Sequence, residues 1–455
     1  MLSYPVRIAL IAALGGFLFG FETVVISGAE QTLEHLWQLS KLSQGFTVAS
    51  SLIGTILGSL IAGAPARKYG RKRVLQVIAV LFIVAALGCA FVSEWSLFIC
   101  FRIIGGLAVG ASSVIAPMYI SEIAPARLRG RLAGSFQVNI VAGIVVAYLT
   151  NYLFTRLQLA DSWRWMLGVM VVPSVIFSLL LFSIPESPRW LILNGREAEA
   201  IPTLLKLGEA NIDAAVTAIR ESVKAHQESL FQMRYIKPIL YAMLLAMFNQ
   251  LSGINAILYY APRIFKLAGF SDSQSFSQPI FIGVANLFFT LLAMTVIDRF
   301  GRKKLLIIGS LGMILFLGLT AGAFNSIADA HADGAVSTAA TAATAGTSYL
   351  LFYLVGFIAF FAFSQGAVIW VFISEIFPNS VRSQGGSFGS STHWIMAWII
   401  TTIFPGIVEG SKKGGFYSFV FFAVMMFLQL IFIWRALPET KGRTLEEIQK
   451  DLGIS

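Results

Sequence analysis

The sequence predicts an all-α integral membrane protein with twelve transmembrane helices in two six-helix bundles, joined by short cytoplasmic helices. Its composition, its long apolar runs and an internal repeat predict this fold class. Of the 455 residues, 57% are hydrophobic and only 12% are charged, and the mean hydropathy is +0.78. Soluble domains carry about 25% charged residues, so we expect most of this chain to lie in a bilayer.

Apolar runs long enough to cross the ~30 Å hydrocarbon core, about 20 residues each, occur repeatedly along the chain. The first run follows Arg7, is longer than the apolar part of a signal peptide and contains Glu22. We therefore expect it to be a retained helix. The twelve predicted spans are residues 8–28, 46–65, 74–93, 96–121, 134–154, 165–184, 239–260, 278–297, 305–324, 348–374, 386–408 and 416–436.

The distribution of basic residues predicts the orientation. An even number of spans puts both termini on one side, and about 25 of the 33 Lys and Arg residues fall in loops on that side. About 7 fall on the other side, and Arg102 alone lies within a predicted helix. Basic loops face the cytoplasm, so both termini are expected there. The net charge of +10 then faces anionic lipid, and no nucleic-acid partner is expected.

The chain has two cysteines, Cys89 and Cys100, and both lie in predicted helices. This pattern indicates neither a disulfide framework nor a metal site. No metal and no other cofactor is expected.

Three motifs of the first half recur in the second half. "RKYGRKR" recurs as "DRFGRKK", "SEIAPARLR" as "SEIFPNSVR" and "PESPR" as "PETKG". The last two pairs begin at residues 121 and 374 and at 185 and 438, so they share one offset. A shared offset indicates an internal duplication. The predicted divisions are an N-terminal six-helix bundle over 1–184, cytoplasmic linker helices over 185–237, a C-terminal six-helix bundle over 238–437 and a cytoplasmic tail over 438–455.

Two stretches interrupt the apolar pattern. Residues 185–237 carry many charges in an amphipathic pattern, which predicts short helices. Residues 324–347 are rich in Ala and Thr, and their small, polar composition predicts a flexible outer loop.

The motifs "GGFLFGFETVVISG", "PMYISEIAPARLRG", "PESPRW", "NQLSGINAILYY", "DRFGRKK", "WVFISEIFPNSVR" and "PETKG" occur in this order along nearly the whole chain. With them the sequence resembles the sugar porter family of the major facilitator superfamily, of the bacterial proton-coupled monosaccharide type. The resemblance implies the major facilitator fold, in which two six-helix bundles rock around a central sugar site by alternating access.

The repeated inner-loop motifs have a physical role of their own. A Glu at a helix end and an Arg seven residues later can join neighbouring helices by charge-assisted hydrogen bonds. The alternative for the basic loops, including Arg71, is that they only satisfy the positive-inside rule. Arg67 stands where the family usually has Asp or Asn, so the first-half network is expected to be weaker or differently connected. By resemblance, the gating residues are Arg71, Glu122, Arg129, Glu186, Arg189, Asp298, Arg302, Glu375 and Arg382.

Glu22 is a carboxylate within an apolar run, and such a charge costs at least ~2.5 kcal/mol at the centre of a membrane helix. We therefore expect it to face a cavity, to pair with a cation or to be protonated. Arg102 is the candidate partner. In similar proton-coupled porters an acid at the position of Glu22, usually Asp, faces an Arg at the position of Arg102, and protonation releases the pair. The alternative is a static structural ion pair.

The resemblance also implies a sugar site of polar groups beside aromatic rings, which suits the hydroxyls and the apolar face of a pyranose. Asn and Gln side chains in membrane helices also join helices to one another, and Trp residues also line the membrane interface. The implied substrate-binding residues are Gln137, Ile140, Asn249, Gln250, Asn255, Tyr259, Asn286, Phe361, Trp370, His393 and Trp394.

Three positions of this set and its surroundings depart from the family pattern. Asn249 replaces a frequent Gln, and His393 stands where Asn or Gln is usual. Ala367 stands where many relatives have a helix-bending Pro, which leaves Gly366 as the expected point of flexure.

The resemblance implies a proton-coupled symporter of a monosaccharide, a hexose or a pentose such as glucose, galactose or xylose. The runner-up is a proton-independent facilitated-diffusion uniporter, and a sugar sensor on a carrier fold is a further alternative. An enzyme is not expected, because the four histidines His35, His226, His331 and His393 lie in scattered segments. The expected partners are the sugar, protons and the lipid bilayer, with the monomer as the working unit in a bacterial inner membrane.

Overall fold

The computed structural model describes residues 3–125, 128–209, 211–221, 228–332, 338–443, 445–452 and 454. Among these residues every regular element is a helix, and twelve helices are long and apolar enough to span a membrane, as predicted. The spans are formed by α1 (Tyr4–Val25), α3 (Lys41–Ile61), α5 (Arg71–Phe91), α6 (Trp95–Ile123), α7 (Arg129–Arg156), α8 and α9 (Ser162–Gly168, Val171–Leu181), α13 and α14 (Ile236–Leu251, Ile254–Tyr259), α16 (Asp272–Phe300), α17 (Arg302–Ala332), α18 and α19 (Thr338–Phe363, Gln365–Ile376), α20 (Arg382–Glu409) and α21 (Gly414–Ala436).

Short helices lie between the spans and after the last of them. Three of them, in the stretch predicted to form linker helices, confirm that prediction. The short helices are α2 (Glu30–Leu36), α4 (Gly63–Tyr69), α10 (Pro188–Leu193), α11 (Glu197–Leu207), α12 (Ile212–Glu221), α15 (Ala261–Leu267) and α22 (Leu445–Leu452).

By their contacts the residues form two compact units. The division is not the one drawn from the repeated motifs, because contacts group residues by packing and do not test a duplication. The predicted halves therefore stay a prediction. Unit 1 comprises Met1–Val25, Ser50–Thr150 and Ala160–Gln227, and unit 2 comprises Ile26–Ala49, Asn151–Leu159 and Glu228–Ser455.

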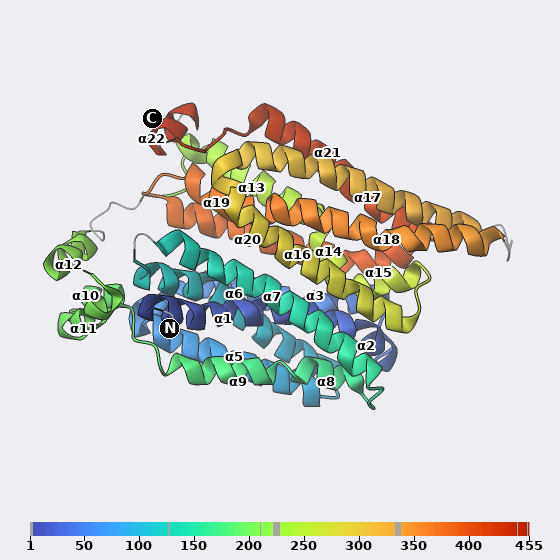
Figure 1. Cartoon of the computed structure of the whole chain (residues 1–455), viewed down its shortest axis with the longest axis horizontal. Helices are drawn as coiled ribbons and strands as arrows, with labels where there is room; N and C mark the ends of the chain where they lie inside the picture. Colours follow the sequence, from blue (N-terminus) through green and yellow to red (C-terminus); the bar gives the residue numbers. More distant parts are fainter. Residues whose placement is uncertain are drawn as a thin grey trace. The chain divides into compact units, whose positions relative to one another are not determined.

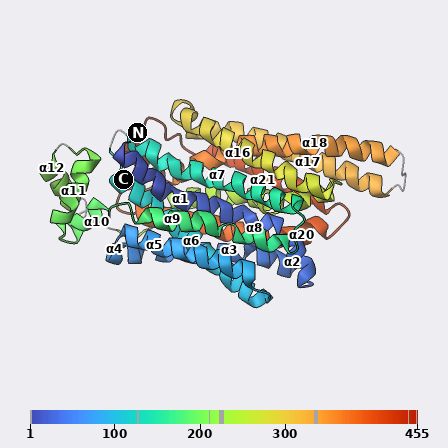
Figure 2. The same cartoon turned by 60° about the horizontal axis from the view of Figure 1, so that its bottom comes forward.

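In unit 1, α1 and α5 pack against α6, and α9 packs against α5. The linker helices α10 to α12 lie at one end of the unit in both views (Figures 1 and 2). Glycines allow the backbones of this unit to approach closely. A Cβ atom on Gly54 would lie 2.0 Å from the Ile103 carbonyl oxygen, and one on Gly106 would lie 1.8 Å from that of Ser51. Small residues promote this kind of close helix packing in membranes.

In unit 2, α17 packs along α18 and α21, and α13 packs along α20. Helices α17 and α18 run side by side in both views (Figures 1 and 2). The predicted loop over residues 324–347 is wrong for most of its length, because α17 continues to Ala332 and α18 begins at Thr338. The stretch is rich in Ala, which has the highest helix propensity of all residues.

Two spans of unit 2 are broken in mid-course. The seventh breaks between α13 and α14 at Gly253, whose φ is +84° and where a Cβ atom would lie 2.5 Å from the Phe422 ring. The tenth breaks between α18 and α19 at Ser364, whose hydroxyl donates to the Phe360 carbonyl at 2.6 Å. Such back-bonding of Ser often bends a helix. The break therefore precedes Gly366 and needs no Pro at position 367.

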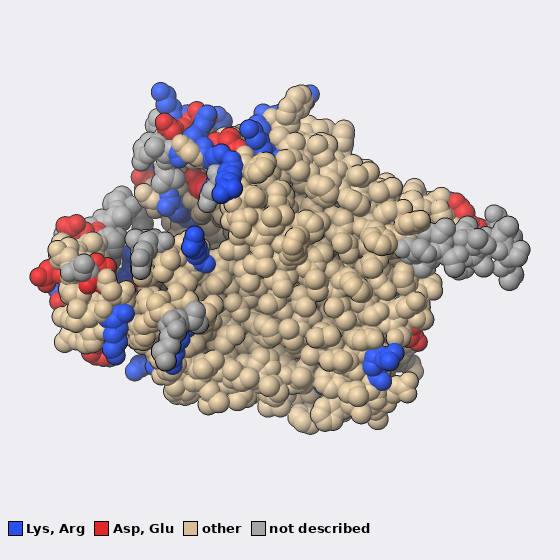
Figure 3. Space-filling model, in the orientation of Figure 1, with Lys and Arg blue, Asp and Glu red and all other residues tan. Residues whose placement is uncertain are grey.

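Charge is confined to the ends of the helices on the visible face of each unit. In Figure 3 Lys, Arg, Asp and Glu side chains gather over α10 to α12 in unit 1 and around α22 in unit 2, and uncharged residues cover the surface along the spans. Uncharged sides and charged ends are what a lipid-embedded helix bundle requires.

Candidate functional site

Glu22 and Arg102 are paired in unit 1. The Arg102 guanidinium donates through Nη1 to the Glu22 carboxylate and through Nη2 to the Ser51 hydroxyl at 2.9 Å. The Arg102 residue is fully buried and Glu22 is 5% exposed. The pairing predicted from the sequence is therefore present, between α1 and α6.

The neighbours of this pair explain its fit. Gly105 lies one helical turn after Arg102 on α6, and a Cβ atom there would lie 3.0 Å from Glu22 Oε1. Glycine thus leaves room for the extra methylene of Glu where Asp is usual in the family. Sequence reasoning missed Ser51, because a Ser in an apolar span carries no distinctive signal.

A second group of charged residues in unit 1, the first charge cluster, comprises Arg71, Glu122, Glu186 and Ser187. Arg71 donates to both carboxylate oxygens of Glu122, from Nε at 2.9 Å and from Nη2 at 2.8 Å. Ser187 donates to the same carboxylate at 2.5 Å. The Glu186 carboxylate accepts from the backbone N–H groups of Arg71 at 2.9 Å and Lys72 at 3.1 Å. A carboxylate at the first turn of α5 also complements the helix dipole.

Unit 2 contains the same arrangement, the second charge cluster, formed by Arg302, Glu375, Glu439 and Thr440. Arg302 Nη2 donates to Glu375 at 2.9 Å, and the Thr440 hydroxyl donates to the other oxygen of Glu375 at 2.6 Å. The Glu439 carboxylate accepts from the backbone N–H of Arg302 at 2.9 Å. Glu439 was missing from the predicted set, although the motif "PETKG" places it at the position equivalent to Glu186 in the repeat.

Of the other predicted gating residues, Arg382 bonds a backbone carbonyl and no carboxylate of these clusters among the described residues. Glu122 and Glu375 each bond the Arg at the start of another helix, Arg71 and Arg302. Arg382 donates to the Phe377 carbonyl at 3.4 Å, and Arg189 lies half-buried in α10. The side chains of Arg129 and Asp298 lie outside the described part of the chain. The exposed Arg67 accepts a hydrogen bond at its carbonyl oxygen from the Trp190 indole at 2.8 Å.

The predicted sugar-binding residues of unit 2 include a compact polar and aromatic group. Gln250 Nε2 lies 3.1 Å from His393 Nε2 and donates to Asn249 Oδ1 at 3.0 Å. The His393 ring centroid lies 4.9 Å from that of Trp370 and 4.8 Å from that of Trp394. Trp370 is 37% exposed, and the other four are buried. Amide groups beside indole faces are the combination expected for binding a pyranose.

The remaining predicted residues are distributed over other helices. Gln137 and Ile140 lie half-buried on α7 in unit 1. The others belong to unit 2 and are buried: Asn255 and Tyr259 on α14, Asn286 on α16 and Phe361 on α18. Of these, Asn286 accepts a hydrogen bond from Thr290 at 3.4 Å.

Sequence reasoning missed a third charged group, the Arg263 cluster, in unit 2. Its members are Glu30, Glu34, Lys41, Gln44, Arg263 and Glu409. Arg263 on α15 donates to Glu30 at 2.8 Å, to Glu34 at 2.6 Å and to Glu409. Lys41 donates to Glu34 at 2.5 Å and also pairs with Glu409. Arg263 is 4% exposed and Glu30 1%, so three carboxylates share two cations in a largely buried place.

The electrostatics of this cluster differ between its two acids on α2. Burial raises the pKa of the Glu30 carboxyl above its ordinary value, although Arg263 opposes the shift. Burial also acts to raise the pKa of Glu34, but the hydrogen bonds from Arg263 and Lys41 outweigh it and lower that pKa. For the Arg263 guanidinium the carboxylates outweigh burial and raise the pKa. Glu30 is therefore the acid of this pair that takes up a proton first as the pH falls.

Comparison with known proteins identifies the family. The family model described as "Sugar (and other) transporter" matches residues 8–452. The chain belongs to this family of sugar transporters. The D-xylose-proton symporter of Escherichia coli K12 is 36% identical, over 98% of this chain and 95% of its own length. The arabinose-proton symporter of Bacillus subtilis is also 36% identical, over 99% of this chain and 95% of its own length.

Solved structures confirm the fold of the transporter. The partially occluded inward-open conformation of the xylose transporter XylE from E. coli matches with a TM-score of 0.83 and 34% identity, covering 97% of this chain and 99% of that one. A structure of the major facilitator superfamily proton:xylose symporter XylE bound to 6-bromo-6-deoxy-D-glucose matches with a TM-score of 0.79 and 34% identity, over 99% of each chain. The predicted major facilitator fold is therefore confirmed.

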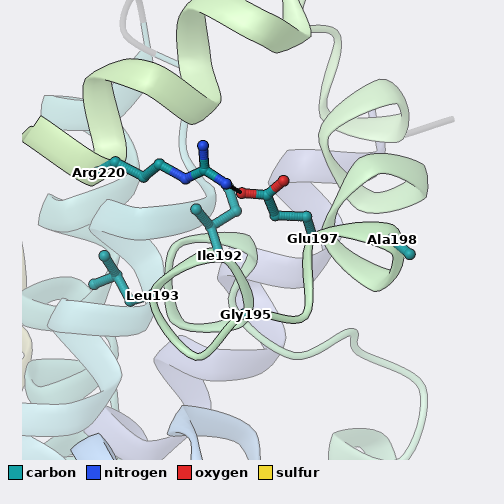
Figure 4. Close-up of a pocket in the computed structure, with 6 residues that line it drawn as sticks. All are labelled: Ile192, Leu193, Gly195, Glu197, Ala198 and Arg220. Atoms are coloured by element: carbon teal, nitrogen blue, oxygen red, sulfur yellow. Dashed lines mark hydrogen bonds and ion pairs between the residues drawn. The ribbon is translucent and has the colours of Figure 1, made fainter.

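A surface hollow of about 530 Å³ lies on the linker helices (Figure 4). Its lining is Ile192, Leu193, Gly195, Glu197, Ala198 and Arg220. Arg220 donates to Glu197 across it, and the Arg220 side chain is 63% exposed. An exposed ion pair of this kind contributes little to stability, and the hollow shares no residue with the predicted sugar site.

Proposed function

We propose that this transporter is a proton-coupled symporter of a monosaccharide. The observation that carries the proposal is the buried pair of Glu22 and Arg102, because an ionisable acid inside a membrane helix is costly and marks proton relays in transporters. Relatives that match over nearly the full length of the chain are named as symporters of protons with D-xylose and with arabinose. In this proposal the polar and aromatic group of unit 2 around Gln250 and His393 binds the sugar.

In the coupling step, a proton from outside neutralises Glu22. The ion pair with Arg102 is then lost, and only a hydrogen bond from the guanidinium to a neutral carboxyl group remains. Arg102 keeps its bond to the Ser51 hydroxyl while α1 is released from α6. Sugar and proton together favour the conformational change, and the ion pair re-forms when the proton leaves inside.

Three charged groups control access in this proposal. The first charge cluster joins the cytoplasmic ends of helices within unit 1, and the second charge cluster does the same within unit 2. The hydrogen bonds of both clusters break when the carrier opens inward. The Arg263 cluster acts at the outer end, because α2 connects the first two spans and is bound there to α15 and to the end of α20. Opening outward then requires α2 to leave Arg263.

We also propose the orientation and the setting. Both termini lie in the cytoplasm, since the basic loops lie on their side of the predicted spans. The transporter works as a monomer in a bacterial inner membrane and performs no enzymatic reaction.

The purified transporter in liposomes is expected to take up a neutral monosaccharide such as xylose, glucose or galactose. Its predicted site offers amide, imidazole and indole groups and contains no Lys, Arg, Asp or Glu. Leaving a charge buried without a partner costs several kcal/mol, so uptake of the corresponding sugar phosphates should be at least about tenfold weaker. A screen of radiolabelled solutes measures this preference. Preferred uptake of an anionic solute or a peptide would refute the substrate class.

Replacing Glu375 with Gln is expected to slow net uptake by about tenfold, because it removes a charge-assisted bond to Arg302 worth about 1.5–3 kcal/mol. The sugar dissociation constant should change by less than about twofold, since Glu375 belongs to the second charge cluster and not to the sugar site. Uptake in vesicles and equilibrium sugar binding measure the two effects. The control is Glu209→Gln, which changes an exposed carboxylate of the linker. An equal loss of binding and uptake would contradict the gating role.

A further inference from the structure

Four side-chain amides and one hydroxyl form a continuous hydrogen-bonded chain inside unit 2, which we call the amide chain. Each member is at most 2% exposed. The amide chain passes from α13 through α19 and α21 to α17, and only its first two members were among the predicted sugar-binding residues. In order, its members are Gln250, Asn249, Gln365, Gln429 and Ser310.

The amide chain has one direction. The NH₂ group of Gln250 donates to the carbonyl oxygen of Asn249 at 3.0 Å, and that of Asn249 donates to Gln365 at 3.2 Å. Gln365 in turn donates to Gln429 at 2.5 Å, and Gln429 donates to the Ser310 hydroxyl at 2.8 Å. Every amide therefore turns its NH₂ group toward Ser310 and its carbonyl oxygen toward Gln250.

The backbone determines this direction. The Ser310 hydroxyl donates its one proton to the Leu306 carbonyl oxygen at 2.8 Å, which can only accept. The Ser310 oxygen is then left as an acceptor, so Gln429 must present its NH₂ group to it. The orientation of each earlier amide follows from the next one, since an amide turned around would place two carbonyl oxygens or two NH₂ groups against each other. Hydrogen bonds aligned in one direction also strengthen one another.

The consequence appears at the other end of the amide chain. Gln250 uses its NH₂ group on Asn249 and lies beside the His393 ring. Its carbonyl oxygen Oε1 is buried and has no hydrogen-bond partner among the described residues. Leaving a buried acceptor unpaired costs about 1–3 kcal/mol. A ligand group that donates a hydrogen bond to this oxygen would recover that free energy.

We propose that Gln365, Gln429 and Ser310 are specificity-determining positioning residues, which hold Gln250 with its carbonyl oxygen toward the sugar. The site then requires a hydroxyl that donates at this point of the sugar ring, and it discriminates against a group that only accepts. This inference rests on the proposed function, because it takes Gln250 to contact the transported monosaccharide.

The test compares the transported sugar with its monodeoxy and deoxyfluoro analogues, one ring position at a time. Fluorine replaces a hydroxyl without being able to donate a hydrogen bond. With the wild type, one position is expected at which both analogues inhibit uptake about five- to a hundredfold more weakly than the parent sugar, since an unpaired acceptor costs about 1–3 kcal/mol.

Ser310→Ala removes the acceptor that fixes the direction, so the four amides can turn around together and present the Gln250 NH₂ group instead. In this variant the fluoro analogue is expected to recover to within about threefold of the parent sugar, with the maximal uptake rate changed by less than twofold.

Gln429→Leu interrupts the amide chain and should also reduce the discrimination between the parent sugar and its fluoro analogue. The matched control is Thr320→Val on the same helix as Ser310, because Thr320 is buried and donates to the Phe316 carbonyl at 2.8 Å but is not part of the amide chain.

Two kinds of failure are distinct. Wild-type protein that takes up no monosaccharide would overturn the proposed function. Wild-type protein that takes up the sugar but shows no such ring position, or equal discrimination in wild type, Ser310→Ala and Thr320→Val, would overturn this inference alone.

Discussion

Glu22→Gln is expected to abolish uphill sugar accumulation while leaving sugar binding intact. An inward proton gradient of one pH unit supplies about 1.4 kcal/mol per proton, which sustains about tenfold accumulation when one proton accompanies each sugar. Gln imitates the shape of the protonated acid but has no proton to release. Accumulation should therefore fall from about tenfold to about onefold, whereas exchange of labelled for unlabelled sugar should continue.

The measurement is uptake into liposomes with and without the pH gradient, together with an electrode that records proton movement in the external medium. Glu199→Gln is a suitable control, because Glu199 forms an exposed pair with Arg196 on the linker helices. If wild-type uptake ignores the gradient and moves no protons, Glu22 has a structural role and the transporter is a passive uniporter.

Arg263→Met is expected to destabilise the transporter and to shift it toward the outward-open conformation. The substitution leaves Glu30 buried without its cation, and removing one partner of a buried pair costs about 3–5 kcal/mol. The loss should appear as a lower melting temperature in detergent. It should also appear as faster labelling, by an impermeant maleimide added outside, of a cysteine placed at Asn255 in a background without Cys89 and Cys100.

Two further variants separate the causes. Glu30→Gln together with Arg263→Met removes the stranded charge, so it should recover most of the melting temperature while remaining outward-open. Arg220→Met is the control, because it also removes an Arg that is paired with a Glu, in this case Glu197 in an exposed ion pair. It should change the melting temperature very little. Slow labelling in both Arg263 variants would show that the cluster does not close the outer end.

The fold was predictable because its signals are local. Each span appears as a long apolar run, and the repeated motifs mark the turns that precede α5 and α17 at Gly70 and Gly301. The error over residues 324–347 arose because composition was taken to indicate a loop, whereas the helix propensity of Ala extended α17 and α18. The break of the tenth span at Ser364 was displaced by a few residues, since back-bonding by Ser leaves no sequence mark comparable to Pro.

The site was predictable only in part. Glu22 and Arg102 could be paired because each is the only charge of its kind in an apolar helix. The partners of Glu122 and Glu375 could not, since several Arg residues follow and distance along the chain does not decide which guanidinium is close. Arg263 and Glu30 gave no signal, because charges at predicted span ends are common and their burial depends on tertiary packing. Gln365 and Gln429 were passed over for the same reason.

The Glu22–Arg102 pair belongs to unit 1 and the amide chain belongs to unit 2, with no residue in common. Substitutions can therefore change the proton coupling and the substrate preference of this carrier independently of each other. One changed amide would alter the preferred sugar without loss of proton coupling, and loss of the Glu22 carboxylate would turn the symporter into a passive uniporter for the same sugar. Related genomes should accordingly show substitutions at positions 365 and 429 that vary with the sugar used, and substitutions at position 22 that vary independently of it.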